Sequence, residues 1–252
     1  TLIALIISDV VGDPLDIIAS GPTVADSSTP AEALEVLRRI IPDPQQVPDS
    51  IWSVLETQQT SSPAQKVSGQ TKVFNQIIGS NATALTAAKK KAEEAGYAIL
   101  SLGSENEGTA YATGIELAEL CLKVRDGEGP VSRPACLLSG GEPVVDLSSA
   151  KNPGKGGRNQ EVVLSAMQRL WEADLSGICI LSGGTDGEDG PTDAAGGILD
   201  SQVLQRAHAL RIDPAHFLKE HNSYPCLVQI GGLLKTGATQ TNVMDLRVAL
   251  VE

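Results

Sequence analysis

The sequence predicts an α/β protein, and three observations carry that prediction. Short apolar runs alternate with longer segments whose apolar residues recur at helical spacing. Hydrophobic residues make up 41% of the 252 residues and aromatic residues only 3%, a composition typical of α/β enzymes. Several apolar runs end in glycines and acidic residues, as strands do where a ligand binds at their carboxyl ends. We expect two α/β domains, residues 1–128 and 129–252.

Strands and helices are predicted to alternate through the first half. Residues 2–8 read as a strand, and residues 30–40 as a helix with Thr29 as N-cap and Pro30 in its first turn. A short helix over 48–57 and a polar, mobile loop over 58–70 follow. The remaining predicted elements are a strand over 73–78, a helix over 82–95 that Gly96 ends, a strand over 97–100 and a helix over 109–125.

The second half begins after a polar segment with glycine and proline, residues 126–134, which is the predicted domain boundary. Strands are predicted over 135–139 and 143–147, followed by a glycine-rich loop over 152–157. The helix after this loop has an apolar face. A strand over 178–181, short helices over about 200–230 and a closing strand over 246–251 complete the prediction.

The charge and hydropathy of the chain restrict its partners. A formal net charge of −12 and a pI near 4.7 disfavour nonspecific binding to nucleic acid or to an anionic membrane. The scarcity of aromatic residues argues against base stacking, and no apolar run is long enough to span a bilayer. A small-molecule partner is therefore expected, and an anionic one is compatible with a few local cations. The sequence does not indicate an oligomeric state.

Cysteine and histidine patterns point away from a metal centre and a disulfide framework. The four cysteines are far apart in apolar segments, which favours buried thiols in a reducing compartment: Cys121, Cys136, Cys179 and Cys226. The three histidines are interpreted as surface or capping residues. The chain opens on a strand-like run without an initiator Met or a signal peptide, which predicts a piece of a longer protein. We expect a cytoplasmic location, with a mitochondrial one as the alternative.

An acidic, glycine-rich loop follows the strand predicted over 178–181. It carries Asp186, Asp189 and Asp193, whose carboxylates repel one another unless a cation or a hydroxyl group meets them. The alternative is an acidic surface turn. The strand over 135–139 ends in a similar way at Gly141 and Glu142, and the strand over 97–100 leads into a third such loop. Loops of this kind at strand ends suggest one shared ligand cleft.

A basic glycine loop opens the helix that follows residue 157. Gly156 and Gly157 let a ligand approach the backbone N–H groups of the helix start, and Lys155 and Arg158 add positive charge. The alternative is a flexible basic turn before a capped helix. The sequence contains no Walker A loop, no dinucleotide fingerprint and no protein-kinase motif.

Two further polar turns contain candidate residues. Asp9 and Asp13 flank a tight turn at a strand end, where they can hold Mg²⁺ or accept a proton from a hydroxyl group, or serve only as turn formers. Thr241 and Asn242 precede the last strand and could bind a ligand. Together, a basic glycine loop and several acidic ones are what phosphoryl transfer requires, although a hydrolase or an isomerase acting on an anionic metabolite would use similar groups.

Five blocks of the sequence, in order, resemble the glycerate 2-kinase family. They are residues 8–13 with 19–23, 139–143, 156–161, 184–190 with 192–196, and 241–245. The second half resembles the family's C-terminal MOFRL domain. The resemblance covers nearly the whole chain and implies ATP-dependent phosphorylation of (R)-glycerate to 2-phosphoglycerate. It implies a cleft between an incomplete Rossmann-like N-terminal domain and a second, MOFRL-type α/β domain.

The resemblance and the residue patterns together give the expected site. The expected catalytic residues are Asp9, Arg158 and Asp186. The expected binding residues for glycerate or ATP are Ser20, Gly141, Glu142, Lys155, Gly156, Gly157, Asn159, Thr241 and Asn242. Mg²⁺ is expected near Asp13, Asp189 and Asp193.

Two other functions stay open from the sequence. The family has a longer N-terminal domain with a lysine proposed for its active site, and that segment precedes residue 1, so a noncatalytic binding fragment is one alternative. Some relatives carry the name hydroxypyruvate reductase, which makes NAD(P)H-dependent reduction the other. The absence of a dinucleotide fingerprint places the reductase second.

Overall fold

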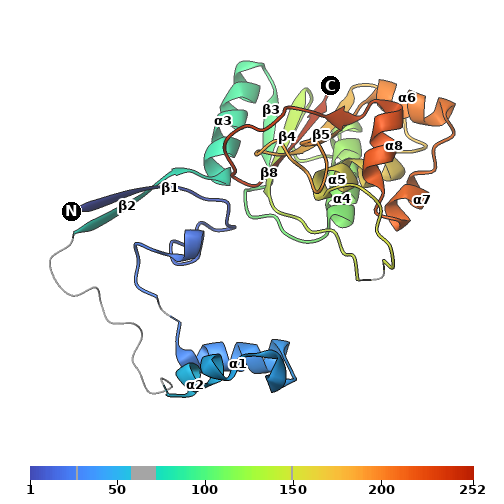
Figure 1. Cartoon of the computed structure of the whole chain (residues 1–252). Coiled ribbons are helices and arrows are strands. Elements are labelled where there is room, and N and C mark those ends of the chain that lie inside the picture. Colours follow the sequence, from blue (N-terminus) through green and yellow to red (C-terminus); the bar gives the residue numbers. More distant parts are fainter. Residues whose placement is uncertain (27, 58–71, 149) are drawn as a thin grey trace. The chain divides into compact units, whose positions relative to one another are not determined.

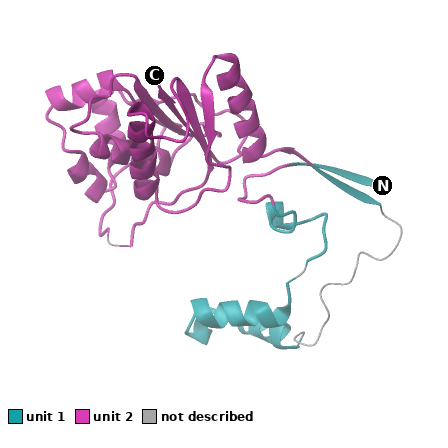
Figure 2. Cartoon of the chain, turned by 180° about the vertical axis from the view of Figure 1, so that it is seen from behind, with its two compact units in different colours: residues 1–6, 14–76 teal, residues 7–13, 77–252 magenta. Residues whose placement is uncertain are grey.

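The computed structural model in Figure 1 describes residues 1–26, 28–57, 72–148 and 150–252. Internal contacts divide the chain into two compact units, residues 1–6 with 14–76 and residues 7–13 with 77–252 (Figure 2). This division falls elsewhere than the boundary predicted at 128/129, because β3 (Ala98–Ser101) pairs in parallel with β4 (Ala135–Gly141) across that boundary. The loop predicted over 58–70 lies outside the described residues.

The helices of the first unit begin at the residues that the sequence predicts. Thr29 and Glu32 form a reciprocal capping box at the start of α1 (Pro30–Ile40), in which the Thr29 side chain accepts from the Glu32 N–H. α1 packs against α2 (Asp49–Thr57). Short 3₁₀ turns occupy Ile18–Ser20 and Pro44–Gln46. The buried apolar side chains of this unit include Ile18, Leu34 and Val47.

β1 (Leu2–Ile7) and β2 (Val73–Gly79) form a separate two-stranded sheet. Leu2 N donates to Lys72 O at 2.8 Å and Ser8 N to Gly79 O at 2.9 Å, so the two strands run parallel. Their apolar side chains remain largely uncovered, with Ile3 68% exposed. We refer to this pair as the β1–β2 ribbon.

The second unit is built on a six-stranded mixed sheet of order β3-β4-β8-β5-β6-β7. The other strands are β5 (Ile178–Gly184), β6 (Gly196–Leu199), β7 (Leu233–Leu234) and β8 (Asp245–Val251). β8 lies between β4 and β5 and is antiparallel to both. β4 and β5 therefore run in the same direction. Their carboxyl ends lie beside the beginning of β8, at one end of these three central strands.

Helices cover both faces of this sheet. α3 (Asn81–Glu94) packs through Leu85 on one face, against Cys136 and Leu138 of β4. The other face carries the main core under α4 (Ala110–Arg125) and α5 (Arg158–Arg169), together with α6 (Ser201–Ala209), α7 (Pro214–Lys219) and α8 (Ser223–Ile230). β8 alternates strictly, with residues 245, 247, 249 and 251 buried and those between them half-buried. The α/β class is therefore confirmed, with β3–β4 as the parallel pair of an otherwise antiparallel sheet.

Two predicted features of the second half differ from the structure. The strand predicted over 143–147 is wrong: Val144 forms only an isolated bridge with Thr109, because Pro143 has no N–H to donate and the chain has passed the end of β4. β6 was not predicted, since it begins with Gly196 and Gly197, which carry no strand signal.

Candidate functional site

The two Ser-Gly-Gly stretches end β4 and β5 in matching positions on either side of β8. Gly141 and Gly184 both pair with Asp245, and Ser139 and Ser182 both pair with Arg247. The repeated triplet thus places two glycine-lined strand ends around the first residues of β8. A Cβ atom at Gly140 would overlap the Asn81 side chain, so the close approach of α3 requires glycine there.

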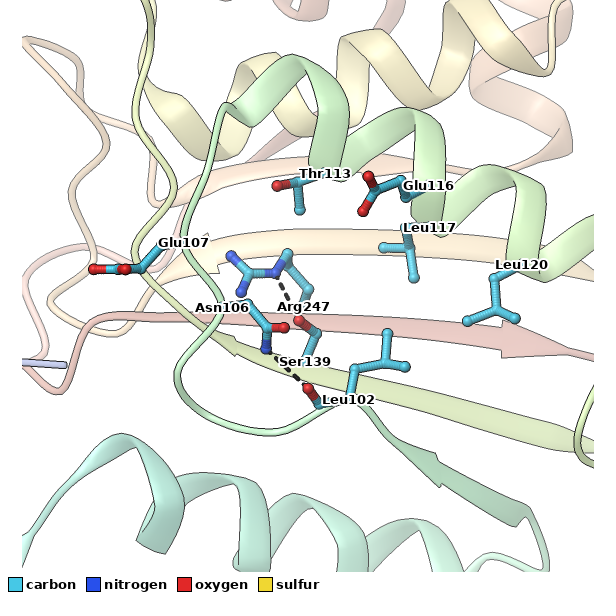
Figure 3. Close-up of a pocket in the computed structure, with 9 residues that line it drawn as sticks. All are labelled: Leu102, Asn106, Glu107, Thr113, Glu116, Leu117, Leu120, Ser139 and Arg247. Carbon is cyan, nitrogen blue, oxygen red and sulfur yellow. Dashed lines mark hydrogen bonds between the residues drawn. The ribbon is translucent and has the colours of Figure 1, made fainter. Parts of the chain in front are cut away.

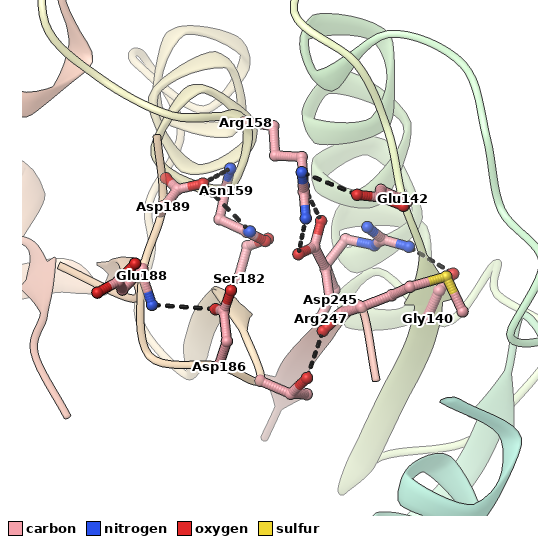
Figure 4. A network of polar contacts seen from close by, with 12 residues as sticks. Gly140, Glu142, Arg158, Asn159, Ser182, Asp186, Glu188, Asp189, Asp245 and Arg247 are labelled. Carbon is pink, nitrogen blue, oxygen red and sulfur yellow. Dashed lines mark hydrogen bonds and ion pairs between the residues drawn. The ribbon is translucent and has the colours of Figure 1, made fainter. Parts of the chain in front are cut away.

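Arg158 lies at the start of α5 and reaches this strand edge. Its Nε and Nη2 donate to the two carboxylate oxygens of Asp245 at 2.7 and 3.0 Å, and its Nη1 lies 3.0 Å from Glu142 Oε1 (Figure 4). Asp245 is fully buried, whereas about a third of the Arg158 side chain (34%) is exposed. Burial alone would lower the pKa of Arg158, but the hydrogen bonds and charges of Asp245 and Glu142 raise it above its usual value. The guanidinium is therefore a fixed, permanent cation with one side open to solvent.

Asp189 caps the same helix from the acidic loop. The N-cap residue, Gly157, has no side chain, and Asp189 accepts from the N–H groups of Asn159 at 3.0 Å and Gln160 at 2.9 Å. A side chain at Gly157 would overlap the Asp189 carboxylate. Burial raises the pKa of Asp189 to about 6, although the backbone N–H groups oppose that shift. The sequence placed Asp189 near Mg²⁺, whereas the structure gives both of its oxygens to the helix start.

Asn159 lies within the protein rather than at a surface that faces a ligand. It is fully buried, its Oδ1 accepts from Ser182 Oγ at 2.6 Å, and its Nδ2 donates to Asp189 Oδ1 at 3.3 Å. Asn159 thus links the helix start, β5 and the acidic loop into one hydrogen-bonded unit. In this structure its side chain is engaged within the protein, and the expected binding role of Asn159 stays a prediction.

Asp186 stands at the other end of the acidic loop. Its Oδ1 accepts from the N–H of Glu188 at 3.0 Å, and its backbone carbonyl accepts from Thr239 N at 2.9 Å. The neighbouring Thr185 side chain bridges residues 243 and 244 just before β8, through bonds of 2.8 and 2.7 Å. Asp186 is half-buried. The carboxylate therefore sits on a loop that hydrogen bonds from residues 239, 243 and 244 hold in place.

Asp9 and Asn242 meet in the second unit. Asn242 Nδ2 donates to Asp9 Oδ2 at 3.3 Å, and Asn242 Oδ1 accepts from Met244 N at 3.0 Å. The structure therefore brings these two predicted residues together, although they are 233 positions apart in the chain. Thr241 contributes its backbone carbonyl to the same turn by accepting from the hydroxyl of Thr239.

The remaining binding candidates lie along the basic loop and in the first unit. The Lys155 N–H donates to Asn222 Oδ1 at 2.9 Å, and its ammonium lies 4.5 Å from the centroid of the Tyr224 ring. Gly156 lies against Ser223, where a Cβ would overlap the serine hydroxyl. Ser20 belongs to the first unit, where it is exposed and has a left-handed backbone with φ 65°.

The predicted magnesium site is not preformed. Asp193 accepts from Tyr224 at 2.6 Å and from Lys235 at 2.8 Å, and Asp13 lies in a turn closed onto Val10. Over the described ranges, no group of three or more His, Cys, Asp or Glu side chains could hold a metal ion. Asp189 serves here as a helix cap and Asp193 as an ion-pair partner. The expectation that Mg²⁺ lies near Asp13, Asp189 and Asp193 stays a prediction.

Asp245 and Arg247 lie at the centre of these polar contacts, although neither is among the site residues that the sequence predicts. A signal for them existed. They occupy alternating positions of an apolar strand, in register with the buried Ala249 and Val251. Charges on the buried face of a strand must be paired or hydrogen-bonded, so that pattern itself marks a polar site.

All four cysteines are free, and three of them are buried. Burial raises the pKa of Cys121 and of Cys226 to about 12. In the part of the chain that the structure describes, no helix has both the length and the apolar character needed to cross a membrane.

Comparison with known proteins identifies the relatives of this chain. The MOFRL family matches residues 135–245, and a domain of unknown function (DUF4147) matches residues 1–56. The chain is 42% identical over 250 residues to a putative hydroxypyruvate reductase of Agrobacterium vitis, with 99% of this chain and 55% of the relative covered. It is 39% identical to a D-glycerate 2-kinase of Thermotoga maritima, with 99% and 56% covered. It is 37% identical to a glycerate kinase of Macaca fascicularis, with 97% and 70% covered.

A solved structure shares the fold. The crystal structure of a glycerate kinase from Thermotoga maritima superposes with a TM-score of 0.84 at 38% sequence identity, covering 99% of this chain and 57% of that one. The chain thus spans a little over half the length of this structure and of the first two relatives.

Proposed function

The chain belongs to the glycerate 2-kinase family, and from this premise we propose that the protein transfers the terminal phosphoryl group of Mg-ATP to the 2-hydroxyl of (R)-glycerate. The products would be 2-phosphoglycerate and ADP. The hydroxyl oxygen forms a bond to the γ-phosphorus, the bond from that phosphorus to the ADP oxygen breaks, and the hydroxyl proton passes to a base.

One observation carries the chemical part of this proposal, namely the fixing of Arg158. Phosphoryl transfer depends on cations that are already in place when negative charge redistributes over the phosphoryl oxygens. Asp245 and Glu142 hold the guanidinium, and its exposed third leaves N–H donors for an anionic ligand. We assign this cation to a phosphoryl group or to the glycerate carboxylate.

The carboxylate of Asp186 is available for the hydroxyl proton. We propose Asp186 as the residue that either accepts this proton or orients the magnesium ion of Mg-ATP, and Asp9 with Asn242 as groups that bind the substrate. We propose that Mg²⁺ enters as part of the Mg-ATP substrate, held by the phosphates and by one or two carboxylates.

A coupled assay decides between the proposed activity and its alternatives. ADP release from ATP with (R)-glycerate, with hydroxypyruvate and NADH as the parallel reaction, is measured on the same folded preparation of the intact protein. We expect ADP release and no NADH oxidation. NADH consumption without ADP release would establish the reductase instead. No turnover in either reaction would favour a noncatalytic binding protein.

The Asp186→Asn variant tests the proposed base. Asparagine keeps an oxygen that can accept from the N–H of Glu188, so we expect an unchanged melting temperature and a kcat lower by on the order of a hundredfold or more. Glu188→Gln, an exposed neighbour in the same loop, is the matched control. A raised Mg²⁺ requirement in Asp186→Asn would indicate the magnesium role, and an unchanged requirement the base. Normal kcat with a lowered melting temperature would make Asp186 a turn residue only.

The free cysteines support a proposal for the location of the protein, and the proposed reaction names its partners. Four free cysteines fit a reducing compartment, so we propose the cytoplasm, with mitochondria as the alternative. Glycerate and Mg-ATP are the proposed small-molecule partners. Fractionation of cells that express the intact protein distinguishes the two compartments.

A further inference from the structure

A pocket of about 290 Å³ opens between α4 and the ends of β4 and β8, beneath the loop that follows β3 (Figure 3). Arg247, Ser139 and Asn106 form its polar end, and Leu102, Leu117 and Leu120 form an apolar wall. None of the residues assigned above to glycerate or ATP lines this pocket. Its size is at the lower end of the range for small-molecule sites.

Arg247 lies at the polar end and is incompletely satisfied. The side chain is 1% exposed, its Nε donates to Ser139 Oγ at 3.2 Å, and its Nη2 donates to the carbonyl of Gly140. Its Nη1 is buried and has no hydrogen-bond partner within the described part of the chain. Buried charged donors are normally paired, so this nitrogen is a position where an acceptor is missing.

The electrostatic surroundings of Arg247 favour an anionic acceptor. Burial lowers the pKa of its guanidinium, and the nearby positive charge of Arg158 adds to that effect, while the negative charge of Asp245 opposes it. Asp245 itself is occupied by the bidentate contact with Arg158. An added negative group at Nη1 would therefore meet a cation that is only partly compensated.

The rest of the pocket limits the size and character of the ligand. The three leucines lie beside one another, away from the guanidinium (Figure 3), and Leu117 is 4% exposed. A phosphate would leave most of its oxygens without donors against this wall. A carboxylate with a short hydrocarbon chain satisfies both ends of the pocket.

We propose that this pocket binds a small aliphatic monocarboxylate, with its carboxylate on Arg247 Nη1 and its hydrocarbon chain among Leu102, Leu117 and Leu120. The carboxylates of Glu107 and Glu116 also line the pocket, and they would favour a cationic ligand instead. A matched pair of probes, butyrate and n-butylammonium, separates the two possibilities because the chains are alike and the charges opposite.

Saturation-transfer NMR on the intact protein tests the proposal. We expect saturable binding of butyrate in the millimolar range, with the strongest transfer to the methyl end, and no saturable binding of n-butylammonium. Equal or stronger binding of n-butylammonium would overturn the proposal. The absence of saturable butyrate binding would overturn it as well.

Two variants locate the binding. Leu102→Trp fills the apolar side from a position that is already 39% exposed, and it should abolish butyrate binding without lowering the melting temperature. Leu210→Trp makes the same change at a leucine outside the pocket, 54% exposed, and should bind butyrate normally. Arg247→Gln should weaken binding by about tenfold or more. If Arg247→Gln does not fold, the Leu102→Trp variant alone tests whether butyrate binds in this pocket. Butyrate binding that survives in Leu102→Trp would contradict the assigned pocket.

Discussion

At the scale of single residues, the pairing of Arg158 with Asp245 determines how a substitution of Arg158 changes activity and stability. The two hydrogen bonds hold a fully buried carboxylate. A lysine at this position would keep the charge and lose the fork that contacts both oxygens.

We therefore expect Arg158→Lys to lower kcat/KM for glycerate by on the order of a hundredfold. We also expect a loss of about 1–2 kcal/mol in the free energy of unfolding, because one charge-assisted hydrogen bond to a buried group disappears. Arg169→Lys, on the same helix but in an exposed ion pair with Glu119, should change neither quantity. Steady-state kinetics and urea unfolding on the three proteins give both numbers, and near-normal kinetics in Arg158→Lys would exclude contact with the substrate.

Asp189 should make the stability of the protein depend on pH in an unusual direction. Its folded-state pKa is raised from 3.8 to about 6, so the folded protein holds the proton more tightly than the unfolded chain. The stabilising contribution is fully present below about pH 4 and is lost as pH rises through about 6, a change on the order of 3 kcal/mol. The free energy of unfolding of the wild type relative to Asp189→Asn should fall over that window.

Asp193 supplies a control of opposite sign. Lys235 and Tyr224 lower its pKa to about 2, so its contribution is present above about pH 4 and is lost as the solution becomes more acidic. Asp193→Asn should therefore differ from the wild type in the neutral range and converge with it in acid. A flat difference curve for Asp189→Asn across the same range would show that the capping carboxylate titrates normally.

At the scale of elements, the contact between α4 and α5 depends on one glycine. A Cβ at Gly114 would overlap Ser165 Oγ and the carbonyl of Val162 on the facing helix. An alanine in a helix interior usually gains about 1 kcal/mol over glycine, so any net loss here is the steric cost of the overlap minus that gain.

We expect Gly114→Ala to lower the free energy of unfolding by about 1–3 kcal/mol in urea titrations. Ala112→Gly, at an exposed position of the same helix, isolates the propensity effect and should cost about 1 kcal/mol. A Gly114→Ala protein that is more stable than the wild type would mean that the helices separate at little cost.

Much of the element order could be predicted from the sequence because local signals specify it. Thr29, Thr109 and Gly96 mark helix ends through capping and turn chemistry that acts within a few residues. The direction and neighbours of β8 have no local signal, since pairing with β4 and β5 is set by the assembled sheet. The strand β6 could not be predicted for a different reason: its two initial glycines are typical of a turn.

For the candidate site too, residues with a local signal could be predicted and residues that depend on distant contacts could not. Arg158 could be predicted because a helix start that follows glycines is a typical binding site for anions. The capping role of Asp189 depends on a contact between residues 30 positions apart, which composition and spacing do not encode. Charge repulsion predicted that the acidic loop needs partners, and those partners are backbone N–H groups, a lysine and a tyrosine.

At the scale of the whole molecule, the β1–β2 ribbon carries several of the exposed large hydrophobic side chains of the described residues. Leu5 is 65% exposed and Phe74 is 56% exposed, on the two strands of the ribbon. Surfaces of this kind bind apolar dyes.

We expect this chain, prepared by itself, to bind 8-anilinonaphthalene-1-sulfonate. The double variant Ile3→Thr with Leu5→Thr, which keeps β-branched or small side chains on the strand, should reduce dye fluorescence by roughly half. Leu210→Thr with Val228→Thr removes two apolar side chains exposed on helical segments and should have little effect. Equal fluorescence from both double variants would place the dye elsewhere.

The central position of β8 also has a consequence for how the protein is made. About a hundred residues separate the end of β4 at Gly141 from the beginning of β8 at Asp245, yet β8 fills the space between β4 and β5. While the chain emerges from the ribosome, β4 and β5 are both translated without the strand that joins them, and their inner edges stay open. The sheet of the second unit therefore cannot grow in the order of translation. Its core closes in a late step, when one strand inserts and completes the two edges together.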